Sequence, residues 1–129
     1  MNDIIAKLKS LDIQREEIWC DSSEPRSIEE LCRSGFNAKA VKKGPDSIKF
    51  GIGVLQNYNL KVTKQSQNLI NEIYAYQYSV DKHNYVTDIP EGGLDHLLDA
   101  LRYVAMMRLS LKAVNRGKYT IGFVGAGLK

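Results

Sequence analysis

Three residues that could bind a metal ion lie within five consecutive positions of one predicted helix. Asp95, His96 and Asp99 occur in the segment GGLDHLLDALRY, residues 92–103, which is otherwise rich in leucine. Side chains three or four residues apart on a helix are neighbours, so Asp99 lies beside both other residues. Carboxylates with one imidazole suit Mg²⁺ or Mn²⁺, and such a cation would convert the repulsion between the two aspartates into binding. The spacing therefore indicates a candidate metal site.

A solvated helix face is the alternative interpretation of the same three residues. At about 100° of rotation per residue, they project from the side opposite an apolar stripe, which would face the core. Aspartate is also favoured near a helix N-terminus, because its charge complements the helix dipole. The spacing leaves both alternatives open. The apolar stripe consists of Leu94, Leu97, Leu98, Leu101, Val104 and Ala105.

A second candidate site lies at Asp21, which ends a predicted strand over residues 16–21. The turn SSEPRS follows, and in it Glu24 precedes Pro25. Ligand sites in α/β sheets gather at the carboxyl ends of strands, so a carboxylate at this place could bind a cation. The alternative is an aspartate that only turns the chain at the end of the strand.

The elements that would position these residues alternate between strands and helices. Ser27 and Glu30 have the spacing of a capping box, so a helix is expected to start at Ser27 and to stop at Gly35. Alternation with short connections indicates an α/β domain, in which the first two strands are parallel. The strands are expected at 16–21, 37–43 and 59–64, with another at 118–124; helices at 2–11, 46–58, 67–80 and from Leu94 past Met107; and a loop at 81–93.

Composition indicates a globular protein rather than a membrane or disulfide-rich protein. The chain has 129 residues, of which 43% are hydrophobic and 26% charged, enough for one small domain with a core. No apolar run reaches the roughly 18–20 residues that span a bilayer, and no signal peptide is recognisable. Cys20 and Cys32 lack metal-site or disulfide-framework spacing, so both are expected to be reduced in a cytoplasmic compartment.

Basic residues are unevenly distributed along the chain, although the formal net charge is only +3. No acidic residue follows Asp99, which gives a basic C-terminal tail over residues 111–129. Such clustering favours a polyanionic partner such as DNA. Alternatively, cations late in a helix complement its dipole. The basic residues after Asp99 are Arg102, Arg108, Lys112, Arg116, Lys118 and Lys129, and a second cluster comprises Lys39, Lys42, Lys43 and Lys49.

Four segments, taken in order, resemble the nuclease half of the large terminase subunit of tailed bacteriophages. The first resembles the family pattern D-S-A-E-P-K/R-S-I-x-E-L with a glycine soon after, with Ser23 in place of the alanine, and the last matches N/D-H-x-x-D-A-x-R-Y. The resemblance covers roughly residues 13–105 and rests on the ordered set. The segments are DSSEPRSIEELCRSGFNA (21–38), KKGPDSIKFGIGVL (42–55), NLINEIYAY (68–76) and DHLLDALRY (95–103).

The resemblance implies an α/β chain with an incomplete ribonuclease H-like fold, in which helices flank a mixed or parallel sheet. It also implies a metal-dependent endonuclease that cuts concatemeric viral DNA during genome packaging. Asp21 and Asp99 match acidic metal ligands of the family, and His96 matches the histidine near or on the metal. Asp95 occupies a position that is often asparagine, which implies a weaker role. The expected cofactor is a pair of Mg²⁺ or Mn²⁺ ions, about 4 Å apart in two-metal sites.

The resemblance further implies partners and a location. Double-stranded DNA would be bound through phosphate contacts of Lys42, Lys43 and Lys49, which lie in a shared segment. In the family, the nuclease works with an adenosine triphosphatase domain, a small terminase subunit and a portal. A phage or prophage protein of this kind is expected in the cytoplasm of a bacterial host, without a membrane association.

The chain departs from the family pattern at its start. The family fold begins with three antiparallel strands, and the first carries another catalytic aspartate. Here the first element is a helix, and Asp3 and Asp12 are poor substitutes for that aspartate. No G-x-x-x-x-G-K-S/T motif of an adenosine triphosphatase occurs. We therefore expect residues 1–110 to form the back half of a nuclease domain, as an expressed fragment or a truncated prophage gene.

These departures leave several functional interpretations open. A nuclease module that is incomplete in this chain is the first, so enzymatic activity is uncertain. The second is an inactive prophage remnant that forms a dimer or binds DNA weakly, and the third is an α/β interaction domain with a solvated Asp/His face. Without the family's first strand, the remaining sheet would have a vacant edge, which is expected to be covered by a second copy of the chain or by the strand at 118–124.

Overall fold

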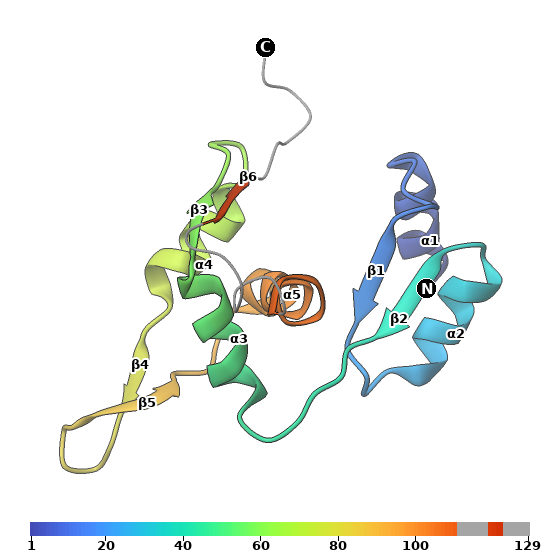
Figure 1. Cartoon of the computed structure of the whole chain (residues 1–129). Coiled ribbons are helices and arrows are strands. Elements are labelled where there is room, and N and C mark those ends of the chain that lie inside the picture. Colours follow the sequence, from blue (N-terminus) through green and yellow to red (C-terminus); the bar gives the residue numbers. More distant parts are fainter. Residues whose placement is uncertain (111–118, 123–129) are drawn as a thin grey trace. The chain divides into compact units, whose positions relative to one another are not determined.

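The structure, a computed structural model, describes residues 1–110 and 119–122. The chain divides into two compact units, Met1–Pro45 and Asp46–Lys129, which Figure 1 shows with their helices and strands labelled. Both units mix helices with strands, as expected for an α/β chain. Among the residues that the structure describes, no helix is long and apolar enough to cross a membrane.

The first unit is a strand–helix–strand crossover preceded by a helix. Strands β1 (Glu17–Cys20) and β2 (Asn37–Ala40) pair in parallel, with Glu17 opposite Asn37 and Cys20 opposite Ala40. The parallel pairing predicted from the strand–helix alternation is therefore confirmed. The ladder continues for one more residue, since the Val41 amide donates to the Cys20 carbonyl over 2.9 Å. The helices are α1 (Asn2–Ser10) and α2 (Pro25–Arg33).

Helix α2 begins two residues earlier than the capping-box spacing predicted. Pro25 occupies the first helical turn, where its missing N–H group costs no hydrogen bond, and Glu24 is the N-cap residue. No side-chain hydrogen bond caps the helix, so the Ser27–Glu30 capping box is wrong. The end at Gly35 is as predicted: its φ of +92° lies in the left-handed region, and the next amide, of Phe36, donates back to the Leu31 carbonyl over 3.1 Å.

The core of the first unit joins α2 to β2. Leu31, Phe36 and Ala38 are buried, and Ile5 and Leu8 of α1 pack against them. Further partly buried contacts come from β1 and α2, through Ile18, Cys20 and Ile28. This packing holds β1 in place and thereby positions Asp21, which follows it.

The second unit packs helix α5 (His96–Val104) against α3 (Ser47–Gln56) and α4 (Gln67–Ala75). Strand β3 (Tyr58–Lys61) lies between α3 and α4 in the sequence, and α5 continues into a π-helical turn, η1 (Ala105–Leu109). Val54, Tyr58 and Ala105 form the buried core, with Leu55, Leu60 and Leu109 packed against it. The Tyr58 hydroxyl also donates to the Leu109 carbonyl over 3.1 Å.

A β-hairpin replaces the loop that was expected over residues 81–93. Strands β4 (Tyr78–Val80) and β5 (Val86–Pro90) pair antiparallel, and the predicted helix over 67–80 ends at Ala75. Asn84 adopts a left-handed φ of 63°, and its amide donates to the Asp81 carbonyl over 3.0 Å, which closes the turn. The β-branched and aromatic residues around this turn suit strands and outweigh the helical spacing.

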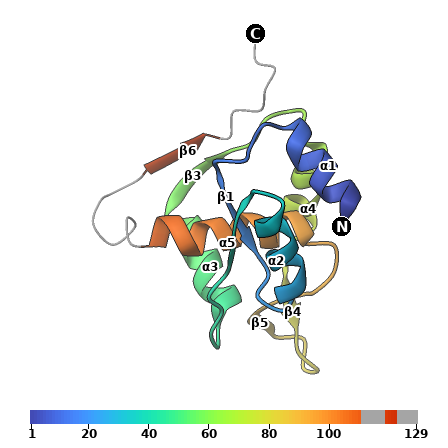
Figure 2. The ribbon, with the colours of Figure 1, turned by 90° about the vertical axis from the view of Figure 1, so that its right-hand side faces the viewer.

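A C-terminal strand pairs with β3. Strand β6 (Tyr119–Gly122) runs parallel to β3, with Tyr58 opposite Tyr119 and Lys61 opposite Gly122, and Figure 2 shows the two strands side by side. It lies within the range 118–124 where a strand was predicted. The expectation that it covers the vacant edge left by the missing first strand is wrong, because its partner is β3 and neither β1 nor β2. The rest of the basic tail, residues 111–118 and 123–129, lies outside the described residues.

A carboxylate from α4 caps the start of α5. The amides of Leu97 and Leu98 both donate to Glu72 Oε2 over 2.9 Å. The first amides of a helix have no partner within the helix, and the helix dipole favours a negative charge beside them. Glu72 therefore ties α4 to the turn that carries the candidate metal ligands.

We predict that Glu72→Ala loosens the start of α5. Loss of a cap costs about 1–2 kcal/mol of the free energy of unfolding, and the amides of Leu97 and Leu98 should exchange faster with solvent. Hydrogen exchange followed by NMR measures both amides directly. Asn71→Ala, at an exposed position of the same helix, serves as the control, and equal exchange in the two variants would contradict the capping role.

Candidate functional site

The first turn of α5 carries the candidate metal ligands of the second unit. Asp95 is the N-cap residue, His96 is the first helical residue, and Asp99 lies in the first turn, where its amide donates to the Asp95 carbonyl over 2.8 Å. The His96 side chain is exposed, whereas Asp95 and Asp99 are half-buried. The single helical turn expected from the sequence is therefore present.

The prediction that the whole apolar stripe faces the core is partly wrong. Leu94 is 82% exposed, and Leu97 and Val104 are 42% and 43% exposed, whereas Leu101 is buried as predicted. The helix instead buries Arg102, and with it Tyr103. Apolar periodicity assigns an arginine to solvent, because it does not register a carboxylate that compensates the buried charge.

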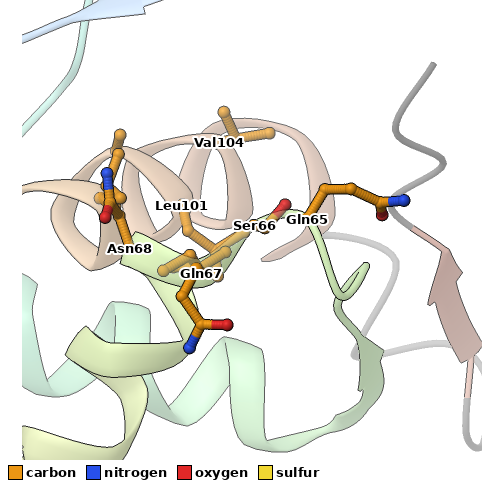
Figure 3. A pocket seen from close by; sticks show the side chains of 9 residues that line it. Gln65, Ser66, Gln67, Asn68, Leu101 and Val104 are labelled. Atoms are coloured by element: carbon orange, nitrogen blue, oxygen red, sulfur yellow. The ribbon is translucent and has the colours of Figure 1, made fainter. Parts of the chain in front are cut away.

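The exposed flank of α5 lines a cavity of about 580 Å³ beside the start of α4. Figure 3 shows Leu101 and Val104 on one side, with Gln65, Ser66, Gln67 and Asn68 on the other. The remaining lining residues are apolar: Leu69, Leu97 and Ala100. None of the candidate metal ligands lines this cavity, so it is separate from the acidic side of the helix.

Asp99 is held through one of its two carboxylate oxygens. Arg102 donates to Asp99 Oδ1 from Nη2 over 2.7 Å and from Nε over 3.3 Å. The Arg102 side chain is 5% exposed and that of Asp99 is 36% exposed. Among the described residues, none donates a hydrogen bond to Asp99 Oδ2. One oxygen is therefore fixed by the protein, and the other is open to a ligand.

Tyr76 is the site residue that the sequence interpretation missed. It follows α4 directly and is half-buried. Burial raises the pKa of its phenol, and the negative charges of Asp95 and Asp99 raise the pKa further, while Arg102 lowers it. The phenol therefore stays protonated within the field of the two aspartates. Its only sequence signal was its position at the end of segment 68–76.

Asp21 follows β1 in the first unit and forms a compact turn. Its Oδ1 accepts hydrogen bonds from the Ser23 amide over 2.9 Å and from the Ser23 hydroxyl over 2.8 Å. The Lys43 ammonium also donates to this oxygen over 2.6 Å, from the segment after β2. Parallel strands end at the same edge of a sheet, which explains why the two residues meet. The turn-forming role considered from the sequence is therefore present.

The three lysines expected to contact DNA have different surroundings. Lys43 pairs with Asp21, and Lys49 pairs with Asp88 of β5. The hydrogen bond between Lys49 and Asp88 raises the pKa of the lysine and lowers that of the aspartate. Lys42 is exposed and makes no ion pair with any described residue. Of the three, only Lys42 therefore offers its charge to solvent without a competing carboxylate.

The candidate ligands are of the chemical types that bind a hard divalent cation. They are divided between the two units. Carboxylate oxygens with one imidazole are ligands that Mg²⁺ and Mn²⁺ accept. Asp95, His96 and Asp99 belong to the second unit, and Asp21 belongs to the first. Within residues 1–110 and 119–122, no three or more His, Cys, Asp or Glu side chains form a group that could hold a metal ion.

Comparisons with known proteins agree with the ordered motifs. The family model described as "Terminase RNAseH like domain" matches residues 2–106. The chain is also similar to the crystal structure of the large terminase nuclease domain from bacteriophage SPP1 with bound Mn, with a TM-score of 0.68 and 27% sequence identity. That match covers 78% of this chain and 59% of the SPP1 chain. No curated protein matches the chain. The predicted ribonuclease H-like fold is thereby confirmed.

We predict that Asp99→Asn lowers the pKa of Tyr76. A nearby negative charge disfavours the phenolate, so its removal should bring the pKa of the phenol closer to its ordinary value. A ¹³C NMR titration of the Tyr76 Cζ signal measures this change. Asp3→Asn, at an exposed position of α1, should leave the titration unchanged. A Tyr76 pKa that is the same in wild type and Asp99→Asn would contradict the proximity of the two side chains.

Proposed function

Because the chain belongs to the family of terminase ribonuclease H-like domains, we propose that it is the metal-dependent nuclease module of a phage terminase. The proposed substrate is concatemeric viral DNA, which the module would cut during genome packaging. The family match over residues 2–106 is the observation that carries the proposal. The match covers 59% of the SPP1 chain, so the activity of a whole nuclease domain is a proposal for this chain.

Asp21 and Asp99 are the proposed principal cation ligands, with His96 near or on the metal and Asp95 in a weaker role. Support comes from Asp99, whose Oδ1 is held by Arg102 while Oδ2 accepts no hydrogen bond from a described residue. The exposed imidazole of His96 lies on the same helical turn. Bound Mg²⁺ or Mn²⁺ would supply Lewis-acid charge for phosphodiester hydrolysis. The presence of Mn in the SPP1 domain supports this choice of metal.

Lys42, Lys43 and Lys49 are the proposed contacts to DNA phosphates. Lys42 can bind directly, whereas Lys43 and Lys49 would exchange a carboxylate for a phosphate. This exchange is feasible because ion pairs at exposed positions contribute little to stability and are screened by salt. Within a complete packaging machine, the proposed partners are the adenosine triphosphatase domain, the small terminase subunit and the portal. The proposed location is the cytoplasm of a bacterial host.

The nuclease proposal predicts Mn²⁺-dependent nicking of supercoiled plasmid by the wild-type chain. Asp21→Asn and Asp99→Asn should each lower the rate by at least about 100-fold, because each removes a charged ligand. Conversion of supercoiled to open-circular DNA on an agarose gel measures the rate. The assay should contain excess Mn²⁺, so that a modest loss of metal affinity is not mistaken for a loss of activity.

Glu29→Gln is the matched control for this assay, because Glu29 is an exposed carboxylate paired with a cation, Arg33, and neither residue belongs to the proposed metal or DNA contacts. It should nick at the wild-type rate. Nicking that is equal in all four proteins would refute the assigned ligands. A wild-type chain that binds DNA but never cuts it would favour the inactive DNA-binding module considered from the sequence.

The DNA contacts predict a change in salt dependence. Lys42→Ala should weaken the binding of duplex DNA regardless of sequence and should reduce the slope of log K against log salt concentration by about 0.9. Fluorescence anisotropy at several salt concentrations measures this slope. Lys9→Ala, on α1 and outside the assigned set, is the control, and an unchanged slope in Lys42→Ala would remove that residue from the interface.

A further inference from the structure

Arg102 is the buried charged residue beside the candidate metal ligands. It is 4% exposed, and its guanidinium lies 5.0 Å from the centre of the Tyr103 ring. A charge at this depth is destabilising unless it is paired and hydrogen-bonded. Arg102 is paired with Asp99, but apolar side chains often replace a buried ion pair without loss of stability, which raises the question of what the position of Arg102 achieves.

The guanidinium is anchored at several points, and these points fix its orientation. Nη1 donates to the Ser47 carbonyl at the start of α3 over 3.4 Å and contacts Met106 Sδ at 3.6 Å. The other edge, through Nε and Nη2, faces Asp99 Oδ1. An arginine held from α3 in this way cannot follow Asp99 if that side chain rotates. Helix α3 therefore restrains Arg102, and Arg102 in turn restrains the carboxylate of Asp99.

Gly51 of α3 provides the space for this arrangement. A Cβ atom at this position would lie 2.2 Å from Arg102 Cγ, 2.8 Å from Arg102 Cδ and 3.0 Å from Met106 Sδ. The clashing carbon atoms belong to the stem of Arg102, whose far end is anchored, so they cannot move aside independently. Gly53, two residues later on the same helix, has no atom within 4 Å of the corresponding Cβ.

We propose that Arg102 is a positioning residue that holds Asp99 Oδ1, so that Oδ2 is presented to a cation, and that Gly51 makes this possible. The inference rests on the proposed function, in which Asp99 is a cation ligand. It adds Arg102 and Gly51, which have no role in that proposal. Fixing a ligand before the cation arrives reduces the orientational freedom that binding must remove. Partners of metal ligands typically contribute about 10- to 100-fold to metal affinity.

A purely electrostatic role and a purely structural role of Arg102 would each give a different result. If Arg102 acts only through its charge, it repels a cation at Asp99, and its removal should tighten cation binding. If Arg102 serves only the stability of the second unit, the folded protein should bind the cation equally well without it. The positioning role predicts weaker binding without Arg102, which distinguishes it from both.

The test measures Mn²⁺ binding to the full chain by paramagnetic broadening of the Asp99 and Ala100 amide signals in NMR spectra. Arg102→Met removes the charge and the donors but keeps an apolar stem, and Arg102→Lys keeps the charge but loses the fork of donors. We expect both variants to need about 10- to 100-fold more Mn²⁺ for half-maximal broadening. Asp99→Asn identifies the broadening that depends on the proposed ligand.

A glycine pair provides a second test that leaves Arg102 itself intact. Gly51→Ala and Gly53→Ala both replace glycine by alanine inside α3, so both gain helix propensity. Only Gly51→Ala displaces the Arg102 stem. We expect weaker Mn²⁺ binding in Gly51→Ala and wild-type binding in Gly53→Ala. This pair keeps the inference testable even if Arg102→Met does not fold.

The Nε–H signal of Arg102 reports the contact with Asp99 in the absence of metal. It should shift in Asp99→Asn and Gly51→Ala and remain unchanged in Gly53→Ala. Mn²⁺ binding that is lost in Asp99→Asn but equal in wild type, Arg102→Met and Gly51→Ala would overturn the positioning role and leave the proposed function intact. Tighter binding by Arg102→Met would also overturn it, in favour of a purely electrostatic effect.

A wild-type chain without Asp99-dependent Mn²⁺ broadening would overturn the proposed function, and with it the role of Arg102 in cation binding. The Nε–H signal separates this result from the previous ones, because its shift in Asp99→Asn depends only on the contact between the two side chains. The two failures are therefore distinguishable in the same set of spectra.

Discussion

The requirement to compensate the buried charge of Arg102 shapes the second unit. The guanidinium needs a carboxylate and a carbonyl, which it takes from Asp99 on its own helix and from Ser47 on α3. Its stem then passes where only Gly51 leaves room. Together these contacts set how α5 faces α3 and which oxygen of Asp99 stays open. The buried guanidinium of Arg102 thus links the packing of the second unit to the chemistry of its acidic turn.

The first turn of α5 satisfies several polar requirements within a few residues. Glu72 accepts hydrogen bonds from two amides at the start of the helix, and Arg102 pairs with the negative charge of Asp99. Tyr76 adds a protonated phenol to the same negative field. Each of these partners comes from outside the Asp–His segment, or from one turn further along the helix. The acidic turn is therefore supported from α4 and from within α5.

Local patterns in the sequence predicted the parts of this fold that depend on local interactions. The parallel pair β1–β2 follows from a short strand–helix–strand alternation, and Gly35 ends α2 because the chain needs a left-handed residue there. The shared turn of Asp95, His96 and Asp99 depends only on helical spacing. In contrast, the predicted helix over 67–80 is divided between α4, which ends at Ala75, and strand β4, because the hairpin partner of β4 lies further along the chain. The burial of Arg102 depends on Gly51, which no local periodicity connects to it.

The parallel register between β3 and β6 has a consequence for the order of folding. Tyr58 pairs with Tyr119, whereas the partners of β1–β2 and β4–β5 are much closer in sequence. Distant pairings close large loops and form slowly, so this ladder is expected to form after the other two. Among the described strands β6 is the sole partner of β3, and it is synthesised after the other described strands. Until then, the edge of β3 that β6 covers is unpaired.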